Sequence, residues 1–136
     1  MLDGFTILMA EDDAGHASLI QRHIKRAGIN NEIIHFKDGQ AVMDFLRDPD
    51  QSTMGRYYLL LLDIRMPKLD GMEVLEKVKS DSHLKSIPVI MLTTTSDPAT
   101  VKRCYELGCT NYIVKPTSVG KFAKVITELG KLLQSV

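Results

Sequence analysis

The chain has 136 residues, of which 44% are hydrophobic and 25% are charged, and its formal net charge is +0. These values are ordinary for a globular protein, and the length suits one domain with a single sizeable core. The balanced charge provides no global basic field for nucleic acid or for an anionic membrane surface.

No segment has the pattern of a membrane span or of a secretion signal. The longest apolar run, 57–62, is far too short to cross a bilayer, and 5–10 lacks a basic flank. Cys104 and Cys109 form no CxxC motif and have no cluster of histidines nearby, so they are interpreted as reduced packing residues. We therefore expect a cytoplasmic single domain over 1–136, without a membrane or nucleic-acid partner and without a fused output domain.

Five short apolar runs alternate with segments whose apolar residues recur at helical spacing. The predicted strands are 5–10, 32–36, 58–62, 89–92 and 111–114. The predicted helices end before Gly28, before Pro49, near Ser80, before Gly108 and, for a last helix capped by Thr117 or Ser118, near the end of the chain. Each connection is long enough for a crossover helix, which predicts an α/β fold with a doubly wound, five-stranded parallel sheet.

Local signals add detail to these elements. Asp38 is a good N-cap for the second helix, and Pro98 is suited to the first turn of the fourth helix. Helical spacing places Val101, Cys104 and Tyr105 of the fourth helix toward the core. The second strand is the most polar of the five, so we expect it near an edge of the sheet.

The run 59–62 consists of four leucines and ends on Asp63. A continuous apolar run of this kind is typical of a parallel strand that is covered by helices on both faces. The loop 64–71 follows, marked by proline and glycine. An acid at the carboxyl end of a central parallel strand lies where open α/β sheets bind ligands. Taken alone, however, Asp63 is also explained as a solvated residue at a strand end.

Polar residues follow three other predicted strands as well. Glu11 and Asp12 follow the first strand, Thr93 follows the fourth and Lys115 follows the fifth. Each has an ordinary explanation as a loop or surface residue. In a parallel sheet, however, all these strand ends lie at the same edge, and a chance gathering of the whole set there is improbable. We interpret the set as one functional site.

The chemistry of this set points to phosphoryl transfer. Carboxylates held close together repel one another and favour a hard cation, and Mg²⁺ prefers one or two carboxylates together with water and a phosphate oxygen. Lys115 and Thr93 could hold the remaining phosphate oxygens by charge and hydrogen bonding. Asp63, presented on a rigid strand end beside a metal, is then a plausible nucleophile toward phosphorus.

Four motifs give the chain a close resemblance to the response-regulator receiver domain of two-component signalling. They are 7–13 (ILMAEDD), 60–71 (LLLDIRMPKLDG), 88–93 (PVIMLT) and 111–116 (NYIVKP). The resemblance covers essentially the whole chain and implies a flavodoxin-like (βα)5 fold with strand order 2-1-3-4-5. The loop around 49–53, the threonine run and the KPTS sequence are similar to stand-alone regulators that partner phytochrome-type or hybrid sensor kinases.

The resemblance also implies roles for individual residues at the acidic end of the site. Asp63 corresponds to the phosphoacceptor, and Glu11 and Asp12 correspond to the acidic pair, with Asp12 as the direct Mg²⁺ ligand and Asp13 as an extra acid. The backbone carbonyl of Arg65 corresponds to a further ligand of the metal.

Further roles are implied for residues at the ends of the fourth and fifth strands. Lys115 corresponds to the phosphate-binding lysine, Thr93 and Tyr112 to the switch pair, and Pro116 to a cis-proline. A sensor histidine kinase would phosphorylate Asp63, and Thr93 and Lys115 would move toward the new charge. Tyr112 would then change position and reshape the face formed by the fourth helix, fifth strand and last helix. Without the resemblance, Tyr112 is explained equally well as an ordinary strand aromatic.

Other functions on a similar fold fit less well. A flavodoxin-like electron carrier needs a phosphate loop after the first strand, where the acids at 11–13 would repel a flavin phosphate. An aspartyl phosphatase needs a second aspartate two positions after the nucleophile, where this chain has Arg65. We therefore expect a signalling domain that supports its own Mg²⁺-dependent phosphotransfer and autodephosphorylation rather than an enzyme.

The remaining alternative is a receiver-like binding module that works without phosphorylation. The sequence leaves open the kinase, the input signal, the downstream target and homodimer formation. It also leaves open the phosphoryl lifetime, the effect of Arg65 on it and the role of the loop 47–56.

Overall fold

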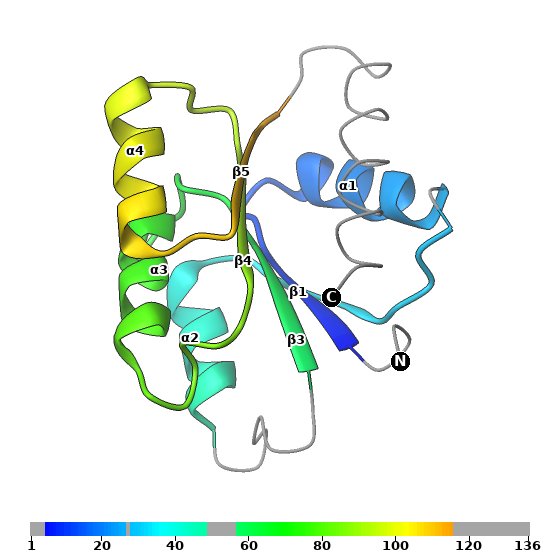
Figure 1. The fold of residues 1–136 in the computed structure, drawn as a ribbon. Helices are drawn as coiled ribbons and strands as arrows, with labels where there is room; N and C mark the ends of the chain where they lie inside the picture. The colour runs from blue at the N-terminus through cyan, green and yellow to red at the C-terminus, as the bar shows by residue number, and fades with distance from the viewer. Residues whose placement is uncertain (1–4, 27, 49–56, 116–136) are drawn as a thin grey trace.

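The computed structural model describes residues 5–26, 28–48 and 57–115, in which parallel strands alternate with helices (Figure 1). The strands are β1 (Phe5–Ala10), β2 (Ile33–Phe36), β3 (Tyr57–Leu62), β4 (Val89–Thr93) and β5 (Asn111–Val114). The helices are α1 (Ala14–Arg26), α2 (Gly39–Arg47), α3 (Gly71–Ser80) and α4 (Pro98–Leu107). Each described boundary lies close to the one predicted from sequence.

The five strands form one parallel sheet in the order β2-β1-β3-β4-β5. The predicted fold class and strand order are therefore confirmed, as is the edge position of β2. The central strand β3 pairs with β1 on one side and with β4 on the other, with Leu60 opposite both Leu8 and Val89. All four strand ends that carry the predicted site thus lie at one edge of the sheet.

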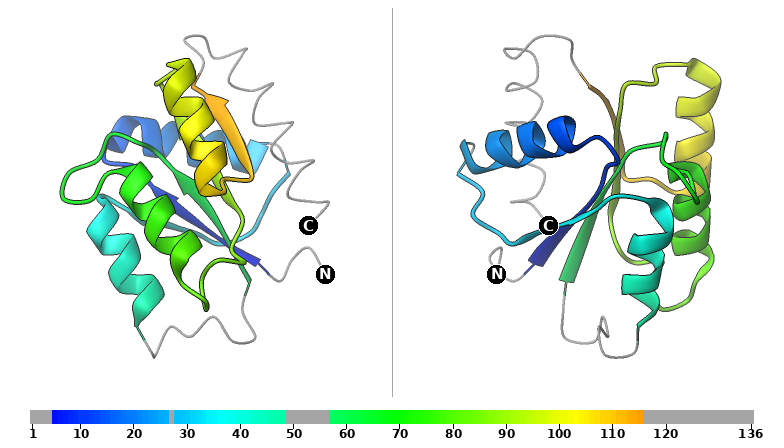
Figure 2. Two further views of the ribbon diagram at one scale, coloured as in Figure 1. Left: turned by 60° about the vertical axis from the view of Figure 1, so that its left-hand side comes forward. Right: turned by 180° about the vertical axis from the view of Figure 1, so that it is seen from behind.

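Helices cover both faces of the sheet, with α2, α3 and α4 on one face and α1 on the other (Figures 1 and 2). The leucines of β3 alternate between these two layers. Leu60 and Leu62 join the cluster that contains the buried side chains of α2 and α3, whereas Leu59 and Leu61 join the cluster of α1. All four are at most 3% exposed. Burial on both faces explains why β3 reads as an uninterrupted apolar run.

The helices begin at side chains that accept hydrogen bonds from their first turns. Asp38 accepts from Ala41 N–H at the start of α2, as predicted, and Asp97 accepts from Thr100 N–H before Pro98 in α4. At α3, Asp70 and Glu73 form a reciprocal capping box. These caps fix where α3 and α4 begin after the carboxyl ends of β3 and β4.

The prediction that Tyr105 faces the core is wrong. Its side chain is 47% exposed, while Cys104 beside it is fully buried and Val101 is partly buried. The tyrosine hydroxyl instead accepts a hydrogen bond from the backbone N–H of Tyr112 at 3.0 Å. The same N–H donates to the Asn111 side-chain oxygen at 2.8 Å, so two side-chain acceptors satisfy it on the edge strand β5.

Some predictions fall outside the described residues. They include the last helix with its cap at Thr117 or Ser118, the cis bond at Pro116 and most of the loop 47–56. Within the described ranges, no helix is both long and apolar enough to span a bilayer.

Candidate functional site

The carboxyl ends of β1, β3, β4 and β5 bring the predicted residues together at one edge of the sheet. Glu11 directly follows β1, Asp63 follows β3, Thr93 ends β4 and Lys115 follows β5. Backbone hydrogen bonds continue the sheet into these positions, from Asp63 N–H to Ala10 carbonyl at 3.1 Å and from Lys115 N–H to Thr93 carbonyl at 2.7 Å. Backbone hydrogen bonds of the sheet therefore fix the main-chain positions of the site residues.

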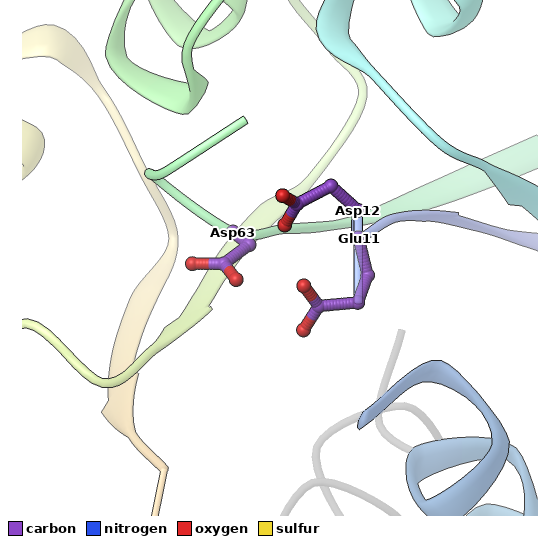
Figure 3. A group of neighbouring side chains, drawn as sticks. All are labelled: Glu11, Asp12 and Asp63. Atoms are coloured by element: carbon purple, nitrogen blue, oxygen red, sulfur yellow. The ribbon is translucent and has the colours of Figure 1, made fainter. Parts of the chain in front are cut away.

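Three carboxylates gather at the ends of β1 and β3 (Figure 3). Glu11, Asp12 and Asp63 each offer a carboxylate oxygen within 4.8 Å of the others. Glu11 and Asp63 are buried, while Asp12 is exposed. Hard oxygen donors that converge in this way suit Mg²⁺ or a similar cation, and the exposed Asp12 leaves one side open to water.

Lys115 supplies the positive charge inside this cluster. Its ammonium group donates to Asp63 Oδ2 at 3.1 Å and contacts Glu11 Oε1 in a second buried ion pair. The lysine is only 9% exposed, so its charge is weakly screened by solvent. The structure thus places Lys115 directly at the predicted phosphoacceptor.

The surroundings shift the pKa values of the two buried acids in opposite directions. Burial raises the pKa of Glu11 to about 7, against the lowering effect of Lys115. Burial also acts to raise the pKa of Asp63, but a hydrogen bond with Glu11 and the charge of Lys115 outweigh it and leave that pKa below its ordinary value. At neutral pH Asp63 is therefore ionised, which is the state that a nucleophile requires.

The loop after Asp63 holds its side chain in place. Asp63 Oδ1 accepts a hydrogen bond from the Ile64 N–H at 2.7 Å, and the Ile64 carbonyl accepts from Gly71 N–H at 2.7 Å. A Cβ at position 71 would overlap with the backbone carbonyl of Asp63, so only glycine allows α3 to begin this close. Arg65 is exposed in this loop.

Thr93 and Tyr112 are linked through the segment that follows β4. Thr93 is fully buried, and its hydroxyl accepts a long hydrogen bond from Thr95 N–H at 3.4 Å. The Tyr112 hydroxyl donates to the Thr95 carbonyl at 2.6 Å. Burial raises the pKa of Tyr112 to about 12, so this hydroxyl stays protonated and keeps its donor role. The two predicted switch residues therefore act on one short stretch of backbone.

Two histidines near the site were not predicted from sequence. His16, in the first turn of α1, lies with Nδ1 3.4 Å from Lys115 Nζ, and His35 of β2 contacts the Glu11 carbonyl through Nε2 at 2.6 Å. His16 follows the acidic run by only three residues, which is the one signal in the sequence that associates it with the site. His35 carries no such signal, because only the pairing of β2 with β1 brings it to Glu11.

Comparison with known proteins assigns the family. The family model for the response regulator receiver domain matches residues 7–127. The chain belongs to the response-regulator receiver family. A receiver domain from Rhodospirillum rubrum is 44% identical, with a TM-score of 0.88 over 96% of this chain and 94% of that one.

Two further relatives are response regulators of cyanobacteria. Response regulator Rcp1 of Synechocystis is 36% identical over 121 residues, 88% of this chain and 82% of that protein. The structure of its Mn²⁺-bound form has a TM-score of 0.85, covering 97% of this chain and 96% of that one. The phosphorylated cyanobacterial phytochrome response regulator RcpA is 30% identical, with a TM-score of 0.86 over 96% and 94% of the two chains. The predicted similarity to phytochrome-type regulators is thereby confirmed.

Proposed function

We propose that this receiver domain accepts a phosphoryl group from a sensor histidine kinase on Asp63, with Mg²⁺, and thereby controls binding of a downstream protein. The observation that carries the proposal is the buried Asp63 held between Lys115 and the acids that follow β1. The phosphorylated relative RcpA and the Mn²⁺-bound relative Rcp1 support the same chemistry.

The residues present fit a divalent cation. Asp12, Asp63 and Glu11 would supply carboxylate oxygens, and the Arg65 backbone carbonyl would supply a neutral oxygen. A bound Mg²⁺ would neutralise this local negative charge and reduce the repulsion between Asp63 and an incoming phosphoryl group.

The protein's own part in the transfer follows from the positions of its side chains. An oxygen of the Asp63 carboxylate attacks phosphorus, the new O–P bond forms as the P–N bond of the phosphohistidine breaks, and the departing imidazole takes up a proton. Lys115 already contacts Asp63 Oδ2 and would stabilise charge on the transferred oxygens. Thr93, fully buried at the end of β4, would donate a hydrogen bond from its hydroxyl to an oxygen of the phosphoryl group.

The switch would run through the backbone at Thr95. When the Thr93 hydroxyl turns to the phosphoryl group, it gives up its bond with Thr95 N–H. Tyr112 is held by the Thr95 carbonyl, so a shift of this segment changes where the tyrosine packs. The consequence would reach the face of α4 and β5, where Tyr105 and Val114 are exposed hydrophobic residues.

Several finer points belong to the same proposal. We expect the domain to hydrolyse its own aspartyl phosphate and to function as a stand-alone regulator in the cytoplasm. A phytochrome-type kinase is the partner suggested by the relative RcpA. Homodimer formation stays an open prediction.

Beryllofluoride, which mimics a phosphoryl group on a carboxylate, tests the proposal. In amide NMR spectra with Mg²⁺, we expect the wild-type protein to shift at Asp63, at Thr93–Thr95 and on β5, and Asp63→Asn to stay unchanged. Spectra of the wild-type protein that do not respond would contradict phosphorylation at Asp63 and favour a phosphorylation-independent binding module.

A further inference from the structure

His16 is attached to the site edge at the start of α1. Its backbone N–H donates to Asp13 Oδ1 at 2.9 Å, which fixes the residue in the first helical turn. Its ring lies beside the buried pair, with Nδ1 3.4 Å from Lys115 Nζ and 3.7 Å from Glu11 Oε1. The imidazole side chain is 49% exposed, so it forms part of the rim of the site.

The contacts of Lys115 show what this ring contributes. A lysine ammonium group has three hydrogens and no acceptor. Its described partners at the site are also three, namely Asp63 Oδ2, Glu11 Oε1 and His16 Nδ1. The first two are carboxylates of residues that directly follow β3 and β1, whereas the third is an imidazole in the first turn of α1. His16 is therefore the neutral acceptor of the set when its proton is on Nε2.

We infer that His16 is a positioning residue that directs Lys115 toward the phosphoryl group on Asp63. The inference rests on the proposed function. When Asp63 carries a phosphoryl group, Lys115 must exchange a carboxylate contact for a phosphate oxygen. An imidazole restrains the ammonium group from a third direction without adding a negative charge that would compete with the phosphoryl group. A carboxylate at position 16 would compete for the lysine instead.

Two substitutions separate the acceptor from the bulk of the ring. Asn Oδ1 is bonded to Cγ as His Nδ1 is, so His16→Asn keeps an acceptor at that position, and His16→Leu keeps the volume without an acceptor. His83→Leu is the matched control, because His83 is exposed in the loop after α3 and lies outside the site. The readout is the beryllofluoride affinity with Mg²⁺, followed by NMR at a pH where free imidazole is neutral.

We expect His16→Leu to weaken beryllofluoride binding about three- to tenfold, which is less than the usual effect of a hydrogen bond to a charged group, since the contact is long and half-exposed. His16→Asn is expected to stay close to the wild-type affinity, as is His83→Leu. Thermal unfolding of the three variants verifies that each is folded at the temperature of the titration.

A second readout uses the resting protein and needs no phosphoryl mimic. Nitrogen-detected NMR of the wild-type histidine ring is expected to show the Nε2–H tautomer with Nδ1 as acceptor. The Lys115 Nζ signal should change in His16→Leu and stay in place in His83→Leu.

The outcomes distinguish this inference from the proposed function. Wild-type affinity in His16→Leu, equal weakening in His16→Asn and His16→Leu, or an Nδ1–H tautomer would each overturn the role of His16. A wild-type protein that does not bind beryllofluoride would overturn the proposed function. In that case the Lys115 Nζ signal would still report whether His16 positions the lysine.

Discussion

The middle of β3 and the edge that follows it are both buried, but they are held in different ways. Leu60 is enclosed by the apolar side chains of α2 and α3, and its burial is complete. Asp63, three residues later, is held by the charge of Lys115 and by the Ile64 N–H. The apolar contacts of Leu60 cannot be exchanged for contacts with a polar ligand. Each hydrogen bond of Asp63, in contrast, can be replaced by a hydrogen bond to a ligand. The strand β3 therefore combines a rigid apolar segment with a polar end that can respond to a ligand.

The largest expected effect on stability comes from a substitution in the apolar part of β3. Leu60→Ala removes a fully buried side chain from the larger core cluster and should lower the free energy of unfolding by about 3 kcal/mol. Leu19→Ala, at a partly buried position of α1, should cost roughly 1 kcal/mol. Denaturant unfolding measures both. The folded fraction of Leu60→Ala should still respond to beryllofluoride. A folded Leu60→Ala protein that does not respond would show that the site depends on the packing of Leu60.

The next largest effect on stability concerns a titratable group within the apolar core, the Cys109 thiol. Burial raises the pKa of the Cys109 thiol from 9.0 to about 11. The folded state therefore favours the protonated thiol, so this contribution to stability is fully present below pH 9 and is lost as the pH rises through 11. The loss should reach about 2–3 kcal/mol. Unfolding of wild type and Cys109→Ala, compared at both ends of this range, isolates the contribution. An equal alkaline loss in both proteins would contradict it.

A smaller effect is expected where the site meets the switch. Tyr112→Phe removes the hydrogen bond to the Thr95 carbonyl and should cost about 1 kcal/mol of stability. Tyr105→Phe is the matched control at an exposed ring and should cost roughly 0.5 kcal/mol. The beryllofluoride-induced shifts on β5 should shrink in Tyr112→Phe alone. If the shifts are of wild-type size in that variant, Tyr112 is not part of the switch.

The smallest effect on stability is expected at the phosphoacceptor itself. Asp63→Asn relieves repulsion within a cluster of three acids and loses the ion pair with Lys115, two effects of opposite sign. The Asn side-chain oxygen still accepts from Ile64 N–H. The free energy of unfolding should therefore change by less than about 1 kcal/mol. A loss as large as that of Leu60→Ala, measured in the same denaturant series, would assign Asp63 a structural role instead.

Sequence patterns predicted the sheet well because its signals are local. The leucine run of β3, the cap at Asp38 and the proline at 98 each depend on neighbouring residues, and each is confirmed. The convergence of Glu11, Asp63 and Lys115 was also predictable, since parallel strands end at one edge. Their protonation was not, because the opposite pKa shifts of Glu11 and Asp63 depend on burial and mutual distances.

The misses at Tyr105 and His16 have a common physical cause. Tyr105 was assigned to the core because helical periodicity treats its ring as apolar, yet its hydroxyl satisfies an N–H of the edge strand β5. His16 was overlooked because its partner, Lys115, is 99 residues away in the chain. In both cases the side chain bonds to a residue outside its own helix, and helical periodicity within α4 or α1 does not encode such a bond.

The central claim is that Asp63 is the residue that is phosphorylated. The most direct measurement incubates the wild-type protein and Asp63→Asn with Mg²⁺ and a small phosphodonor such as acetyl phosphate, followed by intact mass and peptide mapping. We predict the mass gain of one phosphoryl group in the wild type, lost on chelation of Mg²⁺ before the reaction and located at Asp63. A wild-type protein that gains no phosphoryl group, or an Asp63→Asn variant that gains one equally well, would contradict the account.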